Sequence, residues 1–152
     1  MNWRIMAKKG LKARRREFVL DCSVTMSWYF KDEATAYAKS IRQALDRAHA
    51  VVPKLWPVEV ANILILGERR QRSTEAEARK WLGYLQLLPI RVDNETTSRA
   101  WSDIMHVARS YGLSTNDAAY LELAIRLGLP LASLDDQLTN AALRAGAGRF
   151  EP

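Results

Sequence analysis

The strongest constraint on the fold is one short stretch, Phe18-Val19-Leu20-Asp21, which is followed by Cys22-Ser23. Three apolar residues run without alternation into one acid, a pattern typical of a strand buried on both faces in a parallel sheet. In open α/β sheets, ligands bind outside the carboxyl ends of the strands. The stretch therefore predicts an α/β fold in which Asp21 lies at the functional edge of the sheet.

The net charge of +6 comes entirely from the first 17 residues, which hold seven basic residues and one acid. The basic residues are Arg4, Lys8, Lys9, Lys12, Arg14, Arg15 and Arg16. Such an arm binds RNA, DNA or an acidic surface non-specifically, or it is simply solvated. We expect residues 1–17 to form a disordered arm and residues 18–152 a single domain. Met1 and Met6 are alternative starts.

Short apolar strands alternate with helical patterns along the rest of the chain. The expected strands are Phe18–Leu20, Ala50–Val52, Ile90–Val92, Pro130–Ser133 and an edge strand at Arg149–Phe150. This order predicts a three-layer α/β fold with a short central parallel sheet of four to five strands and helices on both faces. The helix after the third strand is expected to bury Trp101, Ile104 and Val107.

The single cysteine excludes an internal disulfide and indicates a reducing, cytoplasmic location. No apolar run approaches the ~18 residues that span a membrane. We therefore expect no membrane partner.

Four acids occur where apolar residues surround them. Asp21 ends the first strand, Glu59 lies within the apolar helix Val58–Leu66, Asp117 opens a helix, and Asp135 follows the fourth strand. A buried carboxylate without a partner costs several kcal/mol. Four of them near the ends of core elements suggest convergence on something positively charged.

Each acid also has an ordinary structural alternative. Asp135 is a candidate N-cap, and Asp117 is a first-turn acid favoured by the helix dipole. Asp21 is a candidate acceptor for loop backbone N–H groups. Glu59 is a candidate partner of Lys54, or of an arginine elsewhere in the chain, in a buried ion pair.

A carboxylate cluster without His or Cys is typical of Mg²⁺ or Mn²⁺ and not of zinc. His49 and His106 have no ligand-like spacing to these acids. A Gly-rich phosphate loop and a Gly-x-Ser-x-Gly elbow are both absent from the sequence. The sequence therefore predicts a divalent-metal site built from carboxylates.

Four motifs, in this order and at these spacings, resemble the PIN-domain family and, within it, the VapC-type toxins of bacterial toxin–antitoxin pairs. They are Phe18–Ser23, Pro57–Asn62, Leu113–Leu121 and Ser133-Leu134-Asp135, with Leu138 beyond. The resemblance runs from about residue 18 to residue 150. Serine replaces the family's commoner threonine at 133, and Asp136 adds an acid.

The resemblance implies a magnesium-dependent endoribonuclease that hydrolyses RNA phosphodiesters with a metal-activated water, in which Mn²⁺ can substitute. It implies that Asp21, Glu59 and Asp117 are the principal metal ligands and catalytic residues, with Asp135 weaker. It also implies a cognate antitoxin protein and a homodimer.

Further residues are expected around that site. Ser133 and Asn62 are candidate second-shell donors, and Asp136 is a candidate additional acid. Arg69, Arg70 and Arg72 are candidate contacts to the RNA backbone or, alternatively, a solvated helix end. Two other functions stay open, namely a PIN-fold nuclease of RNA processing and a non-catalytic PIN-like binding module.

Overall fold

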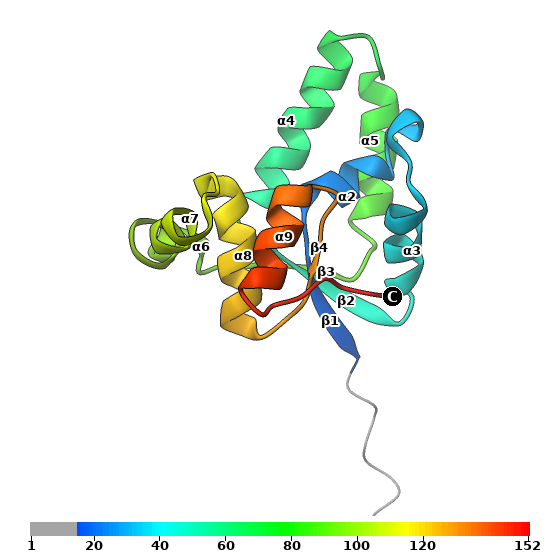
Figure 1. Cartoon of the computed structure of the whole chain (residues 1–152). Helices are drawn as coiled ribbons and strands as arrows, with labels where there is room; N and C mark the ends of the chain where they lie inside the picture. Colours follow the sequence, from blue (N-terminus) through cyan, green and yellow to red (C-terminus); the bar gives the residue numbers. More distant parts are fainter. Residues whose placement is uncertain (1–14) are drawn as a thin grey trace, which may run out of the picture.

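The computed structural model describes residues 15–152, and its centre is a sheet of four parallel strands (Figure 1). The strands are β1 (Arg16–Leu20), β2 (Ala48–Pro53), β3 (Ile90–Asp93) and β4 (Leu131–Ala132), in the spatial order β3-β2-β1-β4. Every neighbouring pair is parallel. The expectation of an α/β fold with a short parallel sheet is confirmed.

The strand register aligns the carboxyl ends at one edge of the sheet. Val19 pairs with Val51, and Pro53 pairs with Asp93. Leu20 pairs with Ala132, so the residues that follow β1 and β4 leave the sheet side by side. Asp21 is the first residue after β1, which places it at this edge, as its position in the sequence predicts.

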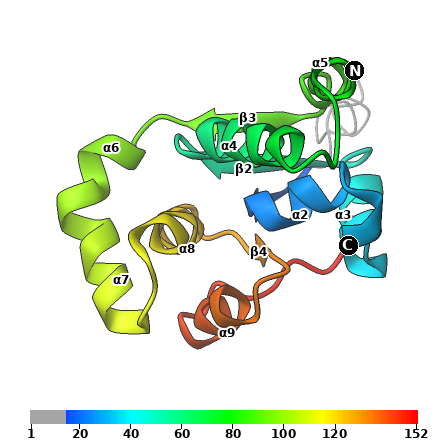
Figure 2. The same ribbon diagram turned by 90° about the horizontal axis from the view of Figure 1, so that it is seen from above.

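Helices cover both faces of the sheet. They are α2 (Cys22–Ser27), α3 (Ala36–Ala44), α4 (Trp56–Arg69), α5 (Glu75–Leu85), α6 (Thr96–Arg99), α7 (Met105–Tyr111), α8 (Thr115–Leu127) and α9 (Asp136–Arg144), with a short 3₁₀ turn at Lys31–Glu33. Figure 1 shows α3 and α5 on one side of the sheet and α6, α7 and α8 on the other. The view from above shows α4 across β2 and β3, α2 and α8 to either side of β4, and α9 beyond β4 (Figure 2).

The core lies around β1, whose last three residues have no exposed surface. Phe18 stacks on Phe150 with ring centroids 4.1 Å apart, which holds the C-terminal segment against the first strand. Tyr120 of α8 is also fully buried. Within residues 15–152, no helix is both long enough and apolar enough to cross a membrane.

Three details differ from the sequence-based expectations. Strand β1 begins at Arg16, two residues before the expected domain boundary, while residues 1–14 of the arm lie outside the described part of the chain. The fifth strand is reduced to a single bridge between Leu131 and Arg149.

The third difference concerns Trp101, whose expected burial is wrong, because it is 93% exposed. Ile104 and Val107 on the same expected face are buried. The reason is a π-helical segment, η2 (Ala100–Ile104), between α6 and α7. Its wider turn changes the angle between successive side chains, so spacing that assumes a regular α-helix misplaces Trp101.

Candidate functional site

Asp21 is the most enclosed of the four candidate acids, with 6% of its surface exposed. One of its carboxylate oxygens, Oδ2, accepts two hydrogen bonds. Ser23 Oγ donates at 2.6 Å and Ser133 Oγ donates at 2.7 Å. Burial raises the pKa of Asp21, and the two hydroxyl donors oppose that rise by stabilising the charged form.

The two serines also fix the loop after β4. The backbone N–H of Leu134 donates to Ser23 Oγ, and that of Asp135 donates to Ser133 Oγ, both at 3.0 Å. Each serine hydroxyl therefore accepts from this loop while it donates to the Asp21 carboxylate. This network holds the end of β1 and the start of α9 in one arrangement.

Glu59 lies in the first turn of α4, and its side chain is half-buried. The phenol of Tyr120, on α8, donates to Glu59 Oε1 at 2.5 Å. Burial raises the pKa of Glu59 to about 7 against the opposing effect of the Tyr120 hydrogen bond, and the charges of Asp21 and Asp117 add to the rise. The contact links α4 to α8 across the carboxyl edge of the sheet.

Asp117 lies in the first turn of α8, where Ser114 is the N-cap. The Asp117 backbone N–H donates to Ser114 Oγ at 3.2 Å, which leaves the Asp117 carboxylate free of the capping role. Burial raises the pKa of Asp117, and repulsion from the charge of Asp135 raises it further. The charge of Asp117 in turn raises the pKa of Asp21 and of Glu59.

Asp135 has the structural role that its sequence position suggested as an alternative. It is the N-cap of α9, and its Oδ1 accepts from the backbone N–H of Leu138 at 2.8 Å. The residue is exposed, and its second carboxylate oxygen makes no hydrogen bond within residues 15–152. Asp135 thus caps a helix and adds negative charge beside Asp117.

The four acids have no positive partner in the part of the chain that the structure describes. Every ion pair among residues 15–152 involves other acids. The buried ion pair considered for Glu59 with Lys54 or an arginine is not formed, since its side chain bonds to Tyr120 instead.

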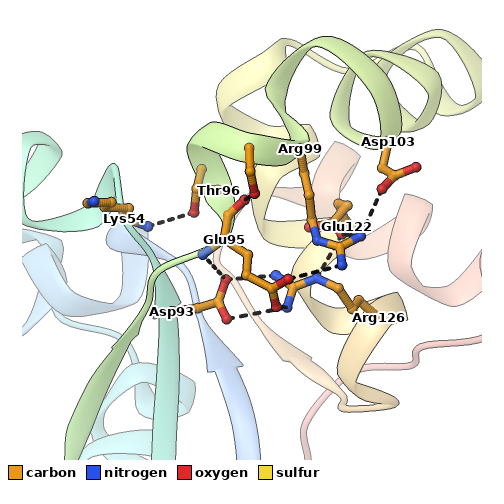
Figure 3. Close-up of polar contacts among 9 residues, drawn as sticks. Lys54, Asp93, Glu95, Thr96, Arg99, Asp103, Glu122 and Arg126 are labelled. Carbon is orange, nitrogen blue, oxygen red and sulfur yellow. Dashed lines mark hydrogen bonds and ion pairs between the residues drawn. The ribbon is translucent and has the colours of Figure 1, made fainter.

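A second group of acids, at the end of β3, shows the opposite arrangement (Figure 3). Arg126 of α8 binds Asp93 at 2.7 Å, Glu95 at 2.8 Å and Glu122 at 2.9 Å. Arg99 adds contacts to Glu95 at 3.1 Å and to Asp103 at 2.8 Å. Each acid of this second group is paired with an arginine, whereas none of the four acids around Asp21 has such a partner among residues 15–152.

The donor set around Asp21 matches Mg²⁺ or Mn²⁺, which prefer oxygen ligands. Among the described residues, no group of three or more His, Cys, Asp or Glu side chains is arranged closely enough to hold a metal ion by itself. Mg²⁺ does not require such a group, because it usually keeps several waters and is bound through one or two carboxylates. Carboxylates such as those of Asp21, Glu59 and Asp117 are of the chemical type that such an ion takes as ligands, with water completing its shell.

The remaining predicted site residues are dispersed. Asn62 and Asp136 are exposed, and neither side chain makes a hydrogen bond within the described range. Arg69 and Arg70 are exposed at the end of α4. Arg72 binds Asp32 at 2.9 Å and Glu33 at 3.2 Å, so an RNA contact there would compete with two acids.

Two residues of the site were not identified from the sequence. Tyr120 follows Asp117 by three residues, so the two share a helix face, and this spacing is the signal that was available. Ser23 does not cap α2, whose N-cap is Asp21; it donates to Asp21 and forms a bridge to Leu134, from whose backbone N–H it accepts. That bridge joins residues 111 positions apart, which no local pattern reveals.

Comparison with known protein families gives a match over most of the chain. The family model described as the PIN domain matches residues 18–143, from within β1 almost to the end of α9. The matched region contains all four acids together with Ser23, Tyr120 and Ser133. No curated protein matches the chain.

Proposed function

Because the chain belongs to the PIN domain family, whose members are typically metal-dependent nucleases, we propose that it is a magnesium-dependent endoribonuclease. The observation that carries the proposal is the absence of any positive partner for Asp21, Glu59, Asp117 and Asp135 within residues 15–152. An RNA phosphate is anionic, so these carboxylates repel it unless a cation lies between them. A divalent ion would compensate the charge of the carboxylates and would also attract the RNA phosphate.

Asp21, Glu59 and Asp117 would hold the ion, and Asp135 would contribute from the rim. When bound, Mg²⁺ would lower the pKa of a coordinated water and would neutralise charge that develops on the phosphate. Ser23 and Ser133 keep the Asp21 carboxylate in place, and Tyr120 does the same for Glu59. Such supporting donors fix the orientation of ligands before the ion binds.

The protonation of Glu59 links ion binding to pH. With a pKa of about 7, Glu59 holds a proton in about half of the molecules at neutral pH when no cation is present. A metal ligand must be deprotonated, so ion binding releases this proton. Ion affinity is therefore expected to rise as the pH increases through 7.

We propose further that the enzyme is the toxin of a VapBC-type toxin–antitoxin pair, acts in the cytoplasm, and forms a homodimer that a cognate antitoxin binds. Two exposed apolar side chains on α4 support a protein partner. Val58 is 71% exposed and Ile65 is 43% exposed. Size-exclusion chromatography with light scattering, with and without the protein encoded alongside, tests this assembly.

The test of the nuclease activity is cleavage of single-stranded RNA by the purified protein. We expect cleavage with Mg²⁺, none in EDTA, and recovery when Mg²⁺ is added back. Glu59→Gln should lower the rate more than about 100-fold, since loss of supporting groups alone costs about 10- to 100-fold at metal sites.

Glu68→Gln is the matched control, because it makes the same change at another position of the same helix. Its cleavage rate should equal that of wild type. Full activity in EDTA contradicts the proposal. Folded protein that binds RNA without cutting it, even with Mg²⁺, would instead support a non-catalytic binding module.

A further inference from the structure

A concave site lies beside α2, α3 and α5, on the side of the sheet that Figure 1 shows opposite α6 and α7. It is a pocket of about 270 Å³. Two aromatic side chains, Trp28 and Tyr84, line it together with three basic ones, Lys31, Lys39 and Arg42. No acidic side chain is among its lining residues.

Both aromatic rings are held in place before any ligand arrives. Trp28 Nε1 donates to the carbonyl of Ala38 at 2.7 Å, which fixes the indole. Arg42 Nε donates to the Tyr84 hydroxyl, and the guanidinium lies 5.3 Å from the centroid of the Tyr84 ring. Tyr84 nevertheless remains 42% exposed. Rings that are already ordered lose little conformational freedom on binding.

The positive charge of the pocket is largely uncompensated. Lys31 and Lys39 are exposed, and within residues 15–152 neither forms an ion pair. Arg42 has one acidic partner, Asp46, at 3.5 Å. The Asp46 side chain is 74% exposed, and exposed pairs of this kind contribute little. The three cations therefore favour an anionic ligand.

Aromatic faces combined with lysine and arginine are the combination that binds single-stranded nucleic acid, in which bases stack and phosphates meet cations. An acidic protein segment would use the charges but not the stacking faces. The volume lies just below the range of typical small-molecule pockets, so it suits one base and not a duplex.

The pocket lies close to the four acids along the chain. Helix α2 runs from its N-cap Asp21 to its C-cap Trp28, and seven residues of helix rise by roughly 10 Å. Successive phosphates of one strand lie about 3.4 Å apart along a helix axis. We propose that this pocket is a subsite for single-stranded RNA, a few nucleotides from the bond that is cut. This inference rests on the proposed nuclease function.

The experiment measures binding of a fluorescent uridine decamer in EDTA, by anisotropy, over a range of salt concentrations. Tyr84→Leu should raise Kd at least about fivefold, because stacking is lost, and leave the salt dependence unchanged. Lys39→Gln should lower the slope of log K against log salt by about 0.7. Lys80→Gln, an exposed lysine of α5 outside the pocket, should alter neither quantity.

Tyr84→Phe keeps the ring and loses only the hydroxyl that Arg42 contacts, so it should bind the decamer more tightly than Tyr84→Leu does, which separates stacking from the loss of this hydrogen bond. If Tyr84→Leu and Lys39→Gln bind the decamer like wild type, the subsite is overturned. If the same variants no longer bind a polyglutamate peptide that wild type binds, the pocket is instead a site for an acidic protein partner. Binding in EDTA is independent of cleavage, so failure of the nuclease proposal appears separately, as RNA that is bound but not cut when Mg²⁺ is present.

Discussion

Glu59 reports most directly on the repulsion among the carboxylates at the carboxyl edge. Its pKa is raised to about 7 by burial and by the charges of Asp21 and Asp117, while its bond from Tyr120 resists the rise. The folded protein then holds a proton that the unfolded chain has released. Where the folded state binds more protons, the free energy of unfolding falls as the pH rises.

The first prediction concerns thermal melts in EDTA. The contribution of Glu59 to the free energy of unfolding is fully present below pH 4.5 and is lost as the pH rises through about 7. Wild type should therefore melt lower at pH 8 than at pH 5.5. Glu59→Gln keeps an acceptor for Tyr120 and removes the charge, so it should melt higher than wild type at pH 8.

Glu68→Gln on the same helix should follow wild type at both pH values. A Glu59→Gln variant that melts below wild type at pH 8 in EDTA would show that Glu59 is a stabilising partner and not one of several repelling charges.

At the scale of elements, helix α8 is fixed at both ends. Its first turn presents Asp117, and Tyr120 one turn later reaches Glu59 on α4. Its last turn carries Arg126, which binds Asp93 at the end of β3 (Figure 3). Nearby, the Lys54 backbone N–H donates to Thr96 Oγ1 at 2.8 Å, which ties the end of β2 to α6.

Arg126→Leu should destabilise the fold because it leaves the buried Asp93 without its ion-pair partner and leaves Glu122 with only Arg99, at 3.7 Å. Removing one partner of a buried pair costs about 3–5 kcal/mol, to be measured by urea unfolding. Arg79→Leu breaks a pair whose side chains are 79% and 76% exposed, and should cost less than about 1 kcal/mol. If the two substitutions lower the free energy of unfolding equally, the Arg126 network stabilises the fold no more than an exposed ion pair does.

The same network gives a pH dependence of opposite sign to that of Glu59. Burial alone would raise the pKa of Asp93, but hydrogen bonds from Arg126 and from the Glu95 backbone lower it. Its contribution is present above the unfolded pKa and is lost as the pH falls through the lower, folded value. The cost of Arg126→Leu should accordingly shrink at acidic pH.

The local elements are well encoded in the sequence. Thr74 and Glu77, at the spacing of a capping box, form one at the start of α5, and Ser114 is the N-cap of α8. Trp101 was misplaced because a π-helical segment breaks the helical period. Glu59 was expected in mid-helix, but α4 begins at Trp56, one residue before Pro57, and so Glu59 lies in its first turn.

For the whole molecule, the parallel topology follows from the alternation of strands and helices, and it brings the strand ends to one edge. The contacts that complete the site do not follow from the sequence in the same way. Tyr120 with Glu59, and Ser133 with Asp21, join residues 61 and 112 positions apart. Only the packed sheet brings such residues together, so their hydrogen bonds lie beyond any local pattern.

The central claim is that the acids around Asp21 act together as a site for a divalent cation, and Mn²⁺ binding measured by electron paramagnetic resonance tests it most directly. Wild type should bind Mn²⁺ at pH 8, with Mg²⁺ in competition. Asp117→Asn should bind at least about tenfold more weakly. Asp46→Asn, the same change at an exposed position away from the four acids, should bind as wild type does. Equal Mn²⁺ affinity in wild type and Asp117→Asn would contradict the account.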